Sequence, residues 1–225
     1  MSWGTVLSQF FLNPDTAESS PDLKAWKPDY PIPKHLRDWG FCPDFNAWLP
    51  GDLVLVSALK PGIIGKAIRS VQVQGGYAQD DARWEHAAVH IGSGTLCEAT
   101  RKGVCVASVF DYAHNHLIRI RRNHALTQDQ RWELAVNALK QQNYSYSFFS
   151  IGSILWKSRK GFWNTQGKPI SFPKRAVICS ELYADAHVKV CGQALGNLRS
   201  GEVTPASLSM DLALADVQTQ WVKIA

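Results

Sequence analysis

The feature that most constrains the fold is a pair of strand-like runs on either side of Gly92-Ser93-Gly94. Two short apolar runs joined by a tight Gly-containing turn predict an antiparallel hairpin. Other segments carry strand or helix patterns: strands at 53–56, 103–109, 116–122 and 217–224, and helices at 63–71, 131–141, 179–190 and from 203. This mixture predicts an α+β fold, in which one antiparallel sheet packs against helices.

The hairpin places ionisable side chains near one another. Period-two alternation puts His86 and His90 on the same face of the first strand. If the turn centres on Ser93, Glu98 lies diagonally across from His86, within reach of a long side chain. A carboxylate that holds one imidazole nitrogen leaves the other nitrogen free to act as a base. The alternatives for a lone histidine are a solvated ring or a core ring bonded to backbone.

A second chemical feature is Cys179, which follows the apolar run 176–178 where a helix is expected to begin. Free N–H groups and the positive end of the helix dipole favour a thiolate at such a position. Lys174 and Arg175, just upstream, add positive potential. The pattern indicates a nucleophile, and the alternative is a buried cysteine that packs as a small apolar residue.

Five short motifs occur in a characteristic order, with His86 before Cys179. They are Pro50-Gly51-Asp52-Leu53-Val54, the segment 62–69, Trp84-Glu85-His86, Cys179-Ser180-Glu181-Leu182 and Thr204-Pro205-Ala206-Ser207-Leu208. This set resembles the permuted papain-fold enzymes: YiiX/YebB-like proteins, lecithin–retinol acyltransferase and their relatives among the NlpC-type cell-wall peptidases. The resemblance covers roughly residues 50–210. It implies a permuted papain-like fold with the nucleophile at a helix N-terminus.

The resemblance also implies a catalytic set. Cys179 would be the nucleophile, His86 its base and Glu98 the residue that orients His86, in acyl transfer through a thioester. The backbone N–H of Cys179 is a candidate to stabilise the oxyanion. His90 shares the face of His86 and is the alternative base.

Three residues beside these motifs are predicted to bind substrate. Trp84 lies in the same motif as His86, and Ser180 and Tyr183 follow Cys179 on the expected helix. No cofactor is predicted. The five cysteines show no regular spacing, and neither a CxxC nor an HExxH motif is present, so we predict no metal site.

Residues 1–49 differ from the rest of the chain because prolines recur among tryptophans. We predict an extended N-terminal arm over 1–49 that packs on a catalytic domain over 50–225 through its aromatic side chains. A segment that binds a partner or is recognised for export is the alternative. The first residues lack a basic region followed by a long apolar run, so we expect synthesis in the cytoplasm without a cleavable signal peptide.

The composition limits the classes of substrate and partner that the protein is expected to bind. Apolar residues make up 45% of the 225 residues, and no apolar run reaches the ~18 residues of a membrane span. The formal charge of +5 favours anionic partners, but no nucleic-acid motif accompanies it. We predict an amidase that cuts cell-wall peptide, secreted by a specialised system as an antibacterial effector with an immunity or secretion partner. The alternatives are a thioesterase, phospholipase or acyltransferase acting on acyl lipid, with an acyl groove at 148–156, and a non-catalytic binding module.

Overall fold

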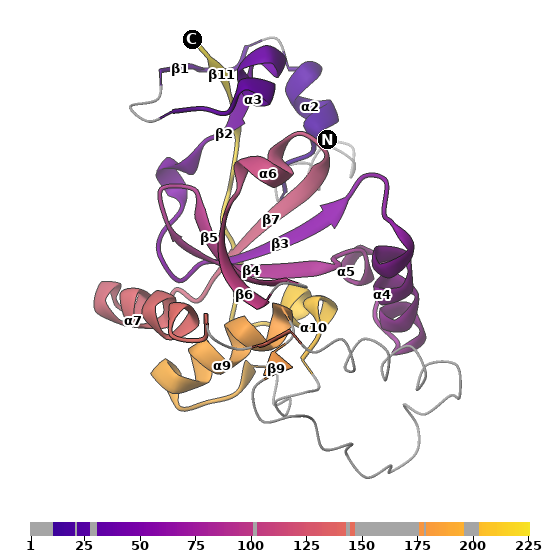
Figure 1. Cartoon of the computed structure of the whole chain (residues 1–225), viewed down its shortest axis with the longest axis vertical. Coiled ribbons are helices and arrows are strands. Elements are labelled where there is room, and N and C mark those ends of the chain that lie inside the picture. Colours follow the sequence, from indigo (N-terminus) through magenta and orange to yellow (C-terminus); the bar gives the residue numbers. More distant parts are fainter. Residues whose placement is uncertain are drawn as a thin grey trace.

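A six-stranded antiparallel sheet forms the centre of the computed structural model (Figure 1). The structure describes residues 11–20, 22–27, 31–100, 103–142, 145–146, 176–177, 179–195 and 203–225, with only the backbone of 145–146 and 176–177. In order across the sheet, the strands are β10 (Ala215–Asp216), β7 (His116–Arg122), β3 (Leu53–Ala58), β4 (His86–Gly92), β5 (Thr95–Thr100) and β6 (Gly103–Ser108).

The central strand β3 is buried on both faces, because it pairs with β4 and β7 and its side chains enter two cores. Leu53 and Leu55 belong to the first core, whereas Val54 and Val56 belong to the second. This explains why the sequence of β3 is an unbroken apolar run rather than an alternating one.

Helices α7 (Gln128–Leu139) and α9 (Cys179–Cys191) cover the first core. Leu134 of α7 and Leu182 of α9 are completely buried there. Three further helices lie outside the N-terminal part of the chain: α4 (Ile63–Gln74), α5 (Gln79–Ala82) and α10 (Pro205–Met210). A two-residue parallel pair, β8 (Ser145–Tyr146) with β9 (Ala176–Val177), precedes α9.

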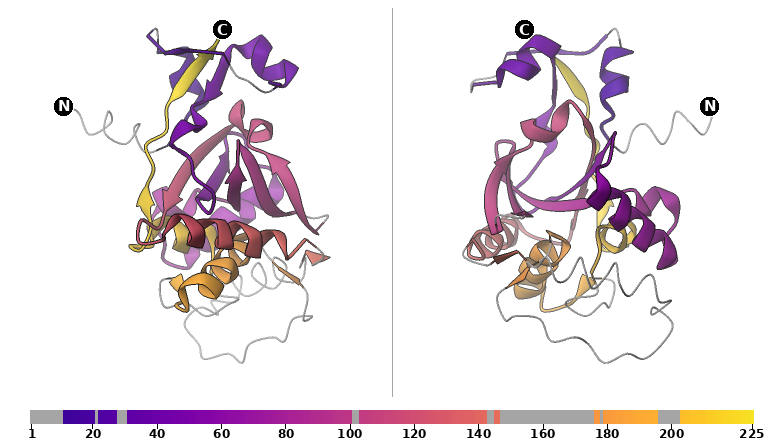
Figure 2. Two further views of the ribbon diagram at one scale, coloured as in Figure 1. Left: turned by 90° about the vertical axis from the view of Figure 1, so that its left-hand side faces the viewer. Right: turned by 45° about the vertical axis from the view of Figure 1, so that its right-hand side comes forward.

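The second core lies under an N-terminal layer, which we define as residues 11–49 of the described chain together with β11 (Trp221–Ile224). In this layer β11 pairs with β1 (Ala25–Trp26) in parallel and with β2 (Phe41–Pro43) antiparallel. Its helices are α2 (Pro14–Glu18), α3 (Lys34–Trp39) and the 3-10 helix η1 (Phe45–Ala47). Figures 1 and 2 show the layer and α9 at opposite ends of the molecule, with α6 (Phe110–Ala113) beside the layer.

The Pro50-Gly51-Asp52 turn has a structural role. Gly51 adopts φ +82°, and a Cβ at this position would lie 2.8 Å from the backbone oxygen of Arg131, so only glycine fits. The buried carboxylate of Asp52 accepts hydrogen bonds from the backbone N–H of Leu49 and from the guanidinium of Arg122. The turn therefore fixes where β3 begins.

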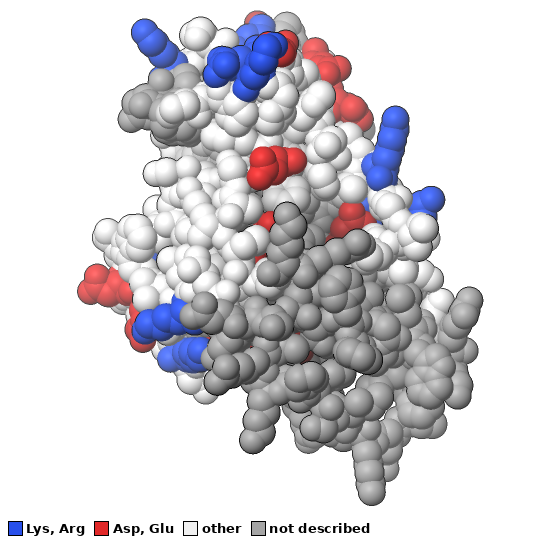
Figure 3. All heavy atoms as spheres, viewed as in Figure 1, with Lys and Arg blue, Asp and Glu red and all other residues white. Residues whose placement is uncertain are grey.

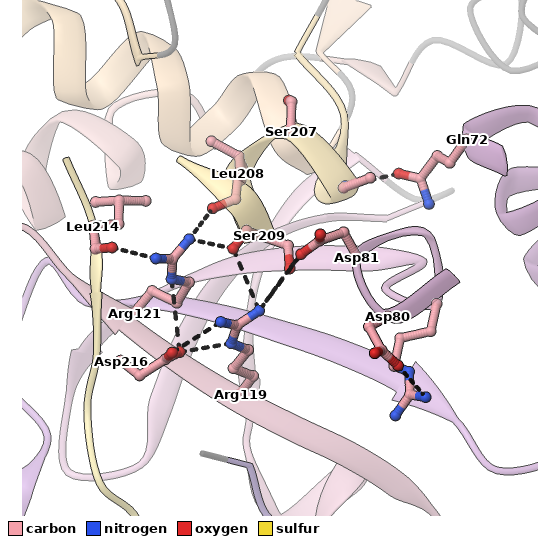
Figure 4. A network of polar contacts seen from close by, with 12 residues as sticks. Gln72, Asp80, Asp81, Arg119, Arg121, Ser207, Leu208, Ser209, Leu214 and Asp216 are labelled. Atoms are coloured by element: carbon pink, nitrogen blue, oxygen red, sulfur yellow. Dashed lines mark hydrogen bonds and ion pairs between the residues drawn. The ribbon is translucent and has the colours of Figure 1, made fainter. Parts of the chain in front are cut away.

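A polar network ties α10 to the sheet (Figure 4). Arg119 of β7 forms two hydrogen bonds with Asp216 and one with the Ser209 hydroxyl. Arg121, which is 6% exposed, donates to the backbone oxygens of Leu208, Ser209 and Leu214. Because both guanidinium groups are half-buried or buried and bind backbone and side-chain oxygens of residues 208–216, the network fixes the chain that follows α9.

The predicted strands and helices are largely confirmed. The structure has a strand at 116–122, and α4 begins at Ile63 and α9 at Cys179, as predicted. Helix α7 begins at Gln128, three residues before its predicted start, with a capping box at Thr127. The final strand is shorter than predicted and begins at Trp221. The sheet packed against helices confirms the predicted α+β class. Within the described ranges, no helix has the length and apolar character needed to cross a membrane. The division at residues 49 and 50 stays a prediction.

Candidate catalytic site

His86 and Glu98 form the centre of the candidate site. His86 is the first residue of β4, and the register pairs Ala88 with Glu98, so Glu98 is diagonal to His86 as predicted. The Nε2 atom of His86 lies 2.8 Å from Oε2 of Glu98. Burial would raise the pKa of Glu98, but the bond and the charge of His86 lower it. The ionised carboxylate can only accept, so Nε2–H of His86 is the donor.

Cys179 approaches the same ring from α9. It is the first residue of that helix and is 6% exposed, while the His86 side chain is 20% exposed. Burial alone would lower the pKa of His86, but hydrogen bonds to Cys179 and Glu98 raise it to about 10. Because Glu98 engages Nε2, Nδ1 is the nitrogen that remains for the sulfur. The structure therefore brings the three predicted catalytic side chains together.

Of the other cysteines, Cys191 also lies beside a histidine, with its sulfur 3.4 Å from Nε2 of His187, but it stands at the end of α9 rather than at the start of a helix. Burial raises the pKa of Cys42 and Cys97 to about 12 and raises that of Cys191 as well. Cys105 lies on β6 and its sulfur is 3.6 Å from the Thr100 hydroxyl. All five thiols are free. Since a nucleophilic cysteine needs a nearby base or positive charge, Cys179 is the best candidate in the described chain.

Tyr112 is a part of the site that the sequence analysis missed. It lies on α6, and its hydroxyl donates a 2.6 Å hydrogen bond to Oε2 of Glu98. Its ring centroid is 6.0 Å from that of His86. A single turn of helix between two strands has no periodic pattern, so the sequence offers no signal for this contact.

The alternative base, His90, is held by backbone groups at both ring nitrogens. Nδ1–H donates to the backbone oxygen of Leu49 at 3.0 Å, and Nε2 accepts from the N–H of Gly94 at 3.2 Å. Burial lowers the pKa of His90, and its exposed fraction is 1%. This neutral ring connects the turn before β3 to the β4–β5 turn, so the geometry favours His86 as the base.

Replacing His90 by glutamine is expected to lower stability and leave the chemistry intact. The loss of two buried hydrogen bonds should cost about 1–3 kcal/mol in the free energy of unfolding, measured in urea. The rate at which iodoacetamide alkylates Cys179 should stay within about twofold of the wild type, because His90 makes no contact with the sulfur. A folded His90→Gln variant with an unreactive Cys179 would instead identify His90 as the base.

The structure buries the three residues predicted to bind substrate. Trp84 is 1% exposed, and Ser180 and Tyr183 are completely buried. Ser180 donates to the backbone oxygen of Val203 at 2.7 Å, which ties α9 to the segment before α10. Trp84 Nε1 and the Tyr183 hydroxyl have no hydrogen-bond partner among the described residues. Their side chains pack in the first core, and a contact with substrate stays a prediction.

A hydrogen-bonded histidine on a β-strand that meets a cysteine at the start of a helix is the arrangement expected of a papain-like fold. A solved structure supports this fold. The metalloprotein YiiX from Escherichia coli O157:H7 superposes with a TM-score of 0.52 over 77% of this chain and 98% of that chain, at 15% identity. The chain therefore has a YiiX-like fold. No family model matches the sequence, and no curated protein matches it.

The word metalloprotein applies to that neighbour. In the part of this chain that the structure describes, no group of three or more His, Cys, Asp or Glu side chains is arranged to hold a metal ion. The residues of the site are instead arranged as a thiol, an imidazole and a carboxylate in sequence.

Proposed function

We propose that the protein is a cysteine hydrolase that acts through a thioester on peptide of the bacterial cell wall. The observation that carries the proposal is the 2.8 Å hydrogen bond from His86 to Glu98, together with Cys179, which stands at the start of α9 and helps to raise the pKa of the same imidazole. Fold alone does not fix activity, so the proposal rests on this site.

The proposed reaction has two halves. The ring of His86 already carries the proton of the Cys179 thiol in a thiolate–imidazolium pair, and the thiolate attacks the carbonyl carbon of the scissile amide. Backbone N–H groups at the start of α9 stabilise the oxyanion, and His86 returns the proton to the departing amine. Water then attacks the thioester with His86 as base, releasing the acid and restoring the thiol. Glu98 holds the imidazole and stabilises its charged form.

Two considerations support cell-wall peptide as the substrate. The NlpC-type peptidases that the motifs resemble cut such peptides, and the formal charge of +5 suits an anionic polymer. On the face in Figure 3, basic and acidic side chains of the described residues are interspersed rather than gathered in one patch. We propose delivery by a specialised secretion system, as an antibacterial effector with an immunity partner.

An acyl lipid is the second candidate substrate, because apolar side chains are exposed on and before α4. Ile63 is 89% exposed, Val73 46% and Leu59 41%. Exposed apolar groups on a helix suit contact with acyl chains or a lipid surface. The apolar run at 148–156, which was the predicted acyl groove, lies outside the described residues.

Product analysis separates these candidates. The purified protein is incubated with peptidoglycan and, separately, with phospholipid vesicles, and the products are identified by mass spectrometry, with Cys179→Ala as the control. Released muropeptides that depend on Cys179 support the proposal, and released fatty acid supports the lipid alternative. The absence of both products would contradict the proposed hydrolase and favour a non-catalytic binding module.

Glu98→Gln is expected to reduce activity less than His86→Ala. The amide still fills the space beside Nε2 but carries no charge, so we expect a loss of about 10–100-fold. His86→Ala removes the base itself and should cost about 10³-fold or more. Both losses are measured as kcat/KM on the substrate that product analysis identifies. The reverse order would show that Glu98 is not the orienting residue.

A further inference from the structure

Tyr112 is held in place by residues other than Cys179, His86 and Glu98. Its helix, α6, is one turn long, too short to be stable in isolation, so its position depends on the contacts around it. Phe110 and Ala113 are buried in the second core, which the N-terminal layer shares. From α3, the Nε2 atom of His35 lies 3.2 Å from the backbone oxygen of Phe110. The N-terminal layer thus fixes α6 in place.

Aromatic contacts between the N-terminal layer and the end of α6 also hold this helix in place. Trp39, the last residue of α3, lies with its ring centroid 4.9 Å from that of His114, the residue after α6. Trp39 also packs edge to face on Trp221 of β11 at 5.3 Å. The residues on either side of Tyr112 are therefore anchored in the layer, and Tyr112 projects from it toward Glu98.

Two donors meet at one oxygen of Glu98. The Tyr112 hydroxyl and Nε2–H of His86 both bind Oε2, at 2.6 and 2.8 Å. The carboxylate cannot rotate without losing one of these bonds, and both favour its charged form. The ionisable groups near this carboxylate are His86 from β4, Cys97 from its own strand β5, Cys105 from β6, Tyr112 from α6, and Cys179 from α9 through His86. Asp111 of α6 and His116 of β7 lie beside Tyr112.

We infer that Tyr112 is a positioning residue, which acts through Glu98 to hold His86 in its orientation toward Cys179, and that the N-terminal layer maintains it through α6. The inference rests on the proposed function and assigns a role to the layer. This role gives a reason why apolar side chains of residues 31–49 pack in the second core with α6 and the sheet.

The test compares the alkylation of Cys179 by iodoacetamide in full-length wild type and Tyr112→Phe, as a function of pH. The phenylalanine keeps the ring but removes one donor from Glu98, so the pKa of Glu98 should rise and the acid limb of the pH–rate profile should move up by about one pH unit. Tyr77, a half-buried tyrosine that follows α4, provides the matched control. In Tyr77→Phe, iodoacetamide should alkylate Cys179 with the wild-type pH–rate profile.

A double-mutant comparison separates positioning from a general structural effect. If Tyr112 acts through Glu98, adding Tyr112→Phe to Glu98→Gln should change the rate less than about twofold, although each substitution alone lowers it about tenfold. Fully additive losses, or an unmoved acid limb in Tyr112→Phe, would overturn the inference.

A second variant covers a failure of Tyr112→Phe to fold. His35→Ala changes an exposed residue and removes the contact with Phe110, so it should move the acid limb in the same direction by a smaller amount. An unchanged profile would contradict the role of the layer. The wild-type profile tests the proposed function separately. A Cys179 that reacts no faster than in His86→Gln would contradict both proposals, whereas a reactive Cys179 with no effect of Tyr112 would overturn only this one.

Discussion

Cys179→Ala is expected to abolish cleavage while the protein stays folded. The nucleophile forms the bond to the acyl carbon, and no other described thiol adjoins His86, so the loss in kcat/KM should be about 10³-fold or more. The change removes one sulfur atom from a small buried side chain, so the free energy of unfolding should change by about 1 kcal/mol or less. Activity is followed on the identified substrate, and stability by chemical denaturation.

Cys191→Ala provides the matched control. Cys191 is the last residue of α9 and its thiol contacts His187 rather than His86. This variant should retain full activity. Cleavage at the wild-type rate by Cys179→Ala, or its loss only in Cys191→Ala, would show that the nucleophile has been assigned to the wrong cysteine.

Asp52→Ala is expected to produce the largest loss of stability. The carboxylate is completely buried and receives two bonds from the guanidinium of Arg122, at 2.7 and 2.6 Å. Removing one partner of a buried ion pair leaves the other charge uncompensated, which costs about 3–5 kcal/mol. Because Leu49 also loses its acceptor, the turn before β3 should loosen. The free energy of unfolding in urea measures the effect.

The control for that substitution is an exposed ion pair. Lys34 and Asp38 face each other on α3, with their side chains 78% and 60% exposed. Asp38→Ala should change the free energy of unfolding by about 0.5 kcal/mol or less. Equal effects of Asp52→Ala and Asp38→Ala would contradict the structural role assigned to the Pro50-Gly51-Asp52 turn.

Short-range patterns explain what the sequence predicted well. The turn at Ser93 determines the register of β4 and β5, and the register in turn places Glu98 diagonal to His86. The start of α9 at Cys179 follows from the apolar run before it and the helical pattern after it. Both features depend on residues that are close in the sequence.

The remaining features depend on contacts between distant parts of the chain. The pairing of β1 with β11 joins Trp26 to Ile224, and two-residue strands have no periodicity to reveal them. The period-two pattern of the strand placed His86 and His90 on the same face, but it could not show that backbone groups bind both ring nitrogens of His90. The burial of Trp84 likewise arises from packing in the first core, which proximity to His86 in sequence does not reveal.

The central claim is that the thiol of Cys179 and the ring of His86 act as a pair. The rate of alkylation of Cys179 by iodoacetamide near neutral pH, with the modified peptide identified by mass spectrometry, tests it most directly. We predict that Cys179 is modified before the other four cysteines and that His86→Gln slows the reaction by about tenfold or more. Equal rates in the wild type and in a folded His86→Gln variant would contradict the pairing on which the proposed function depends.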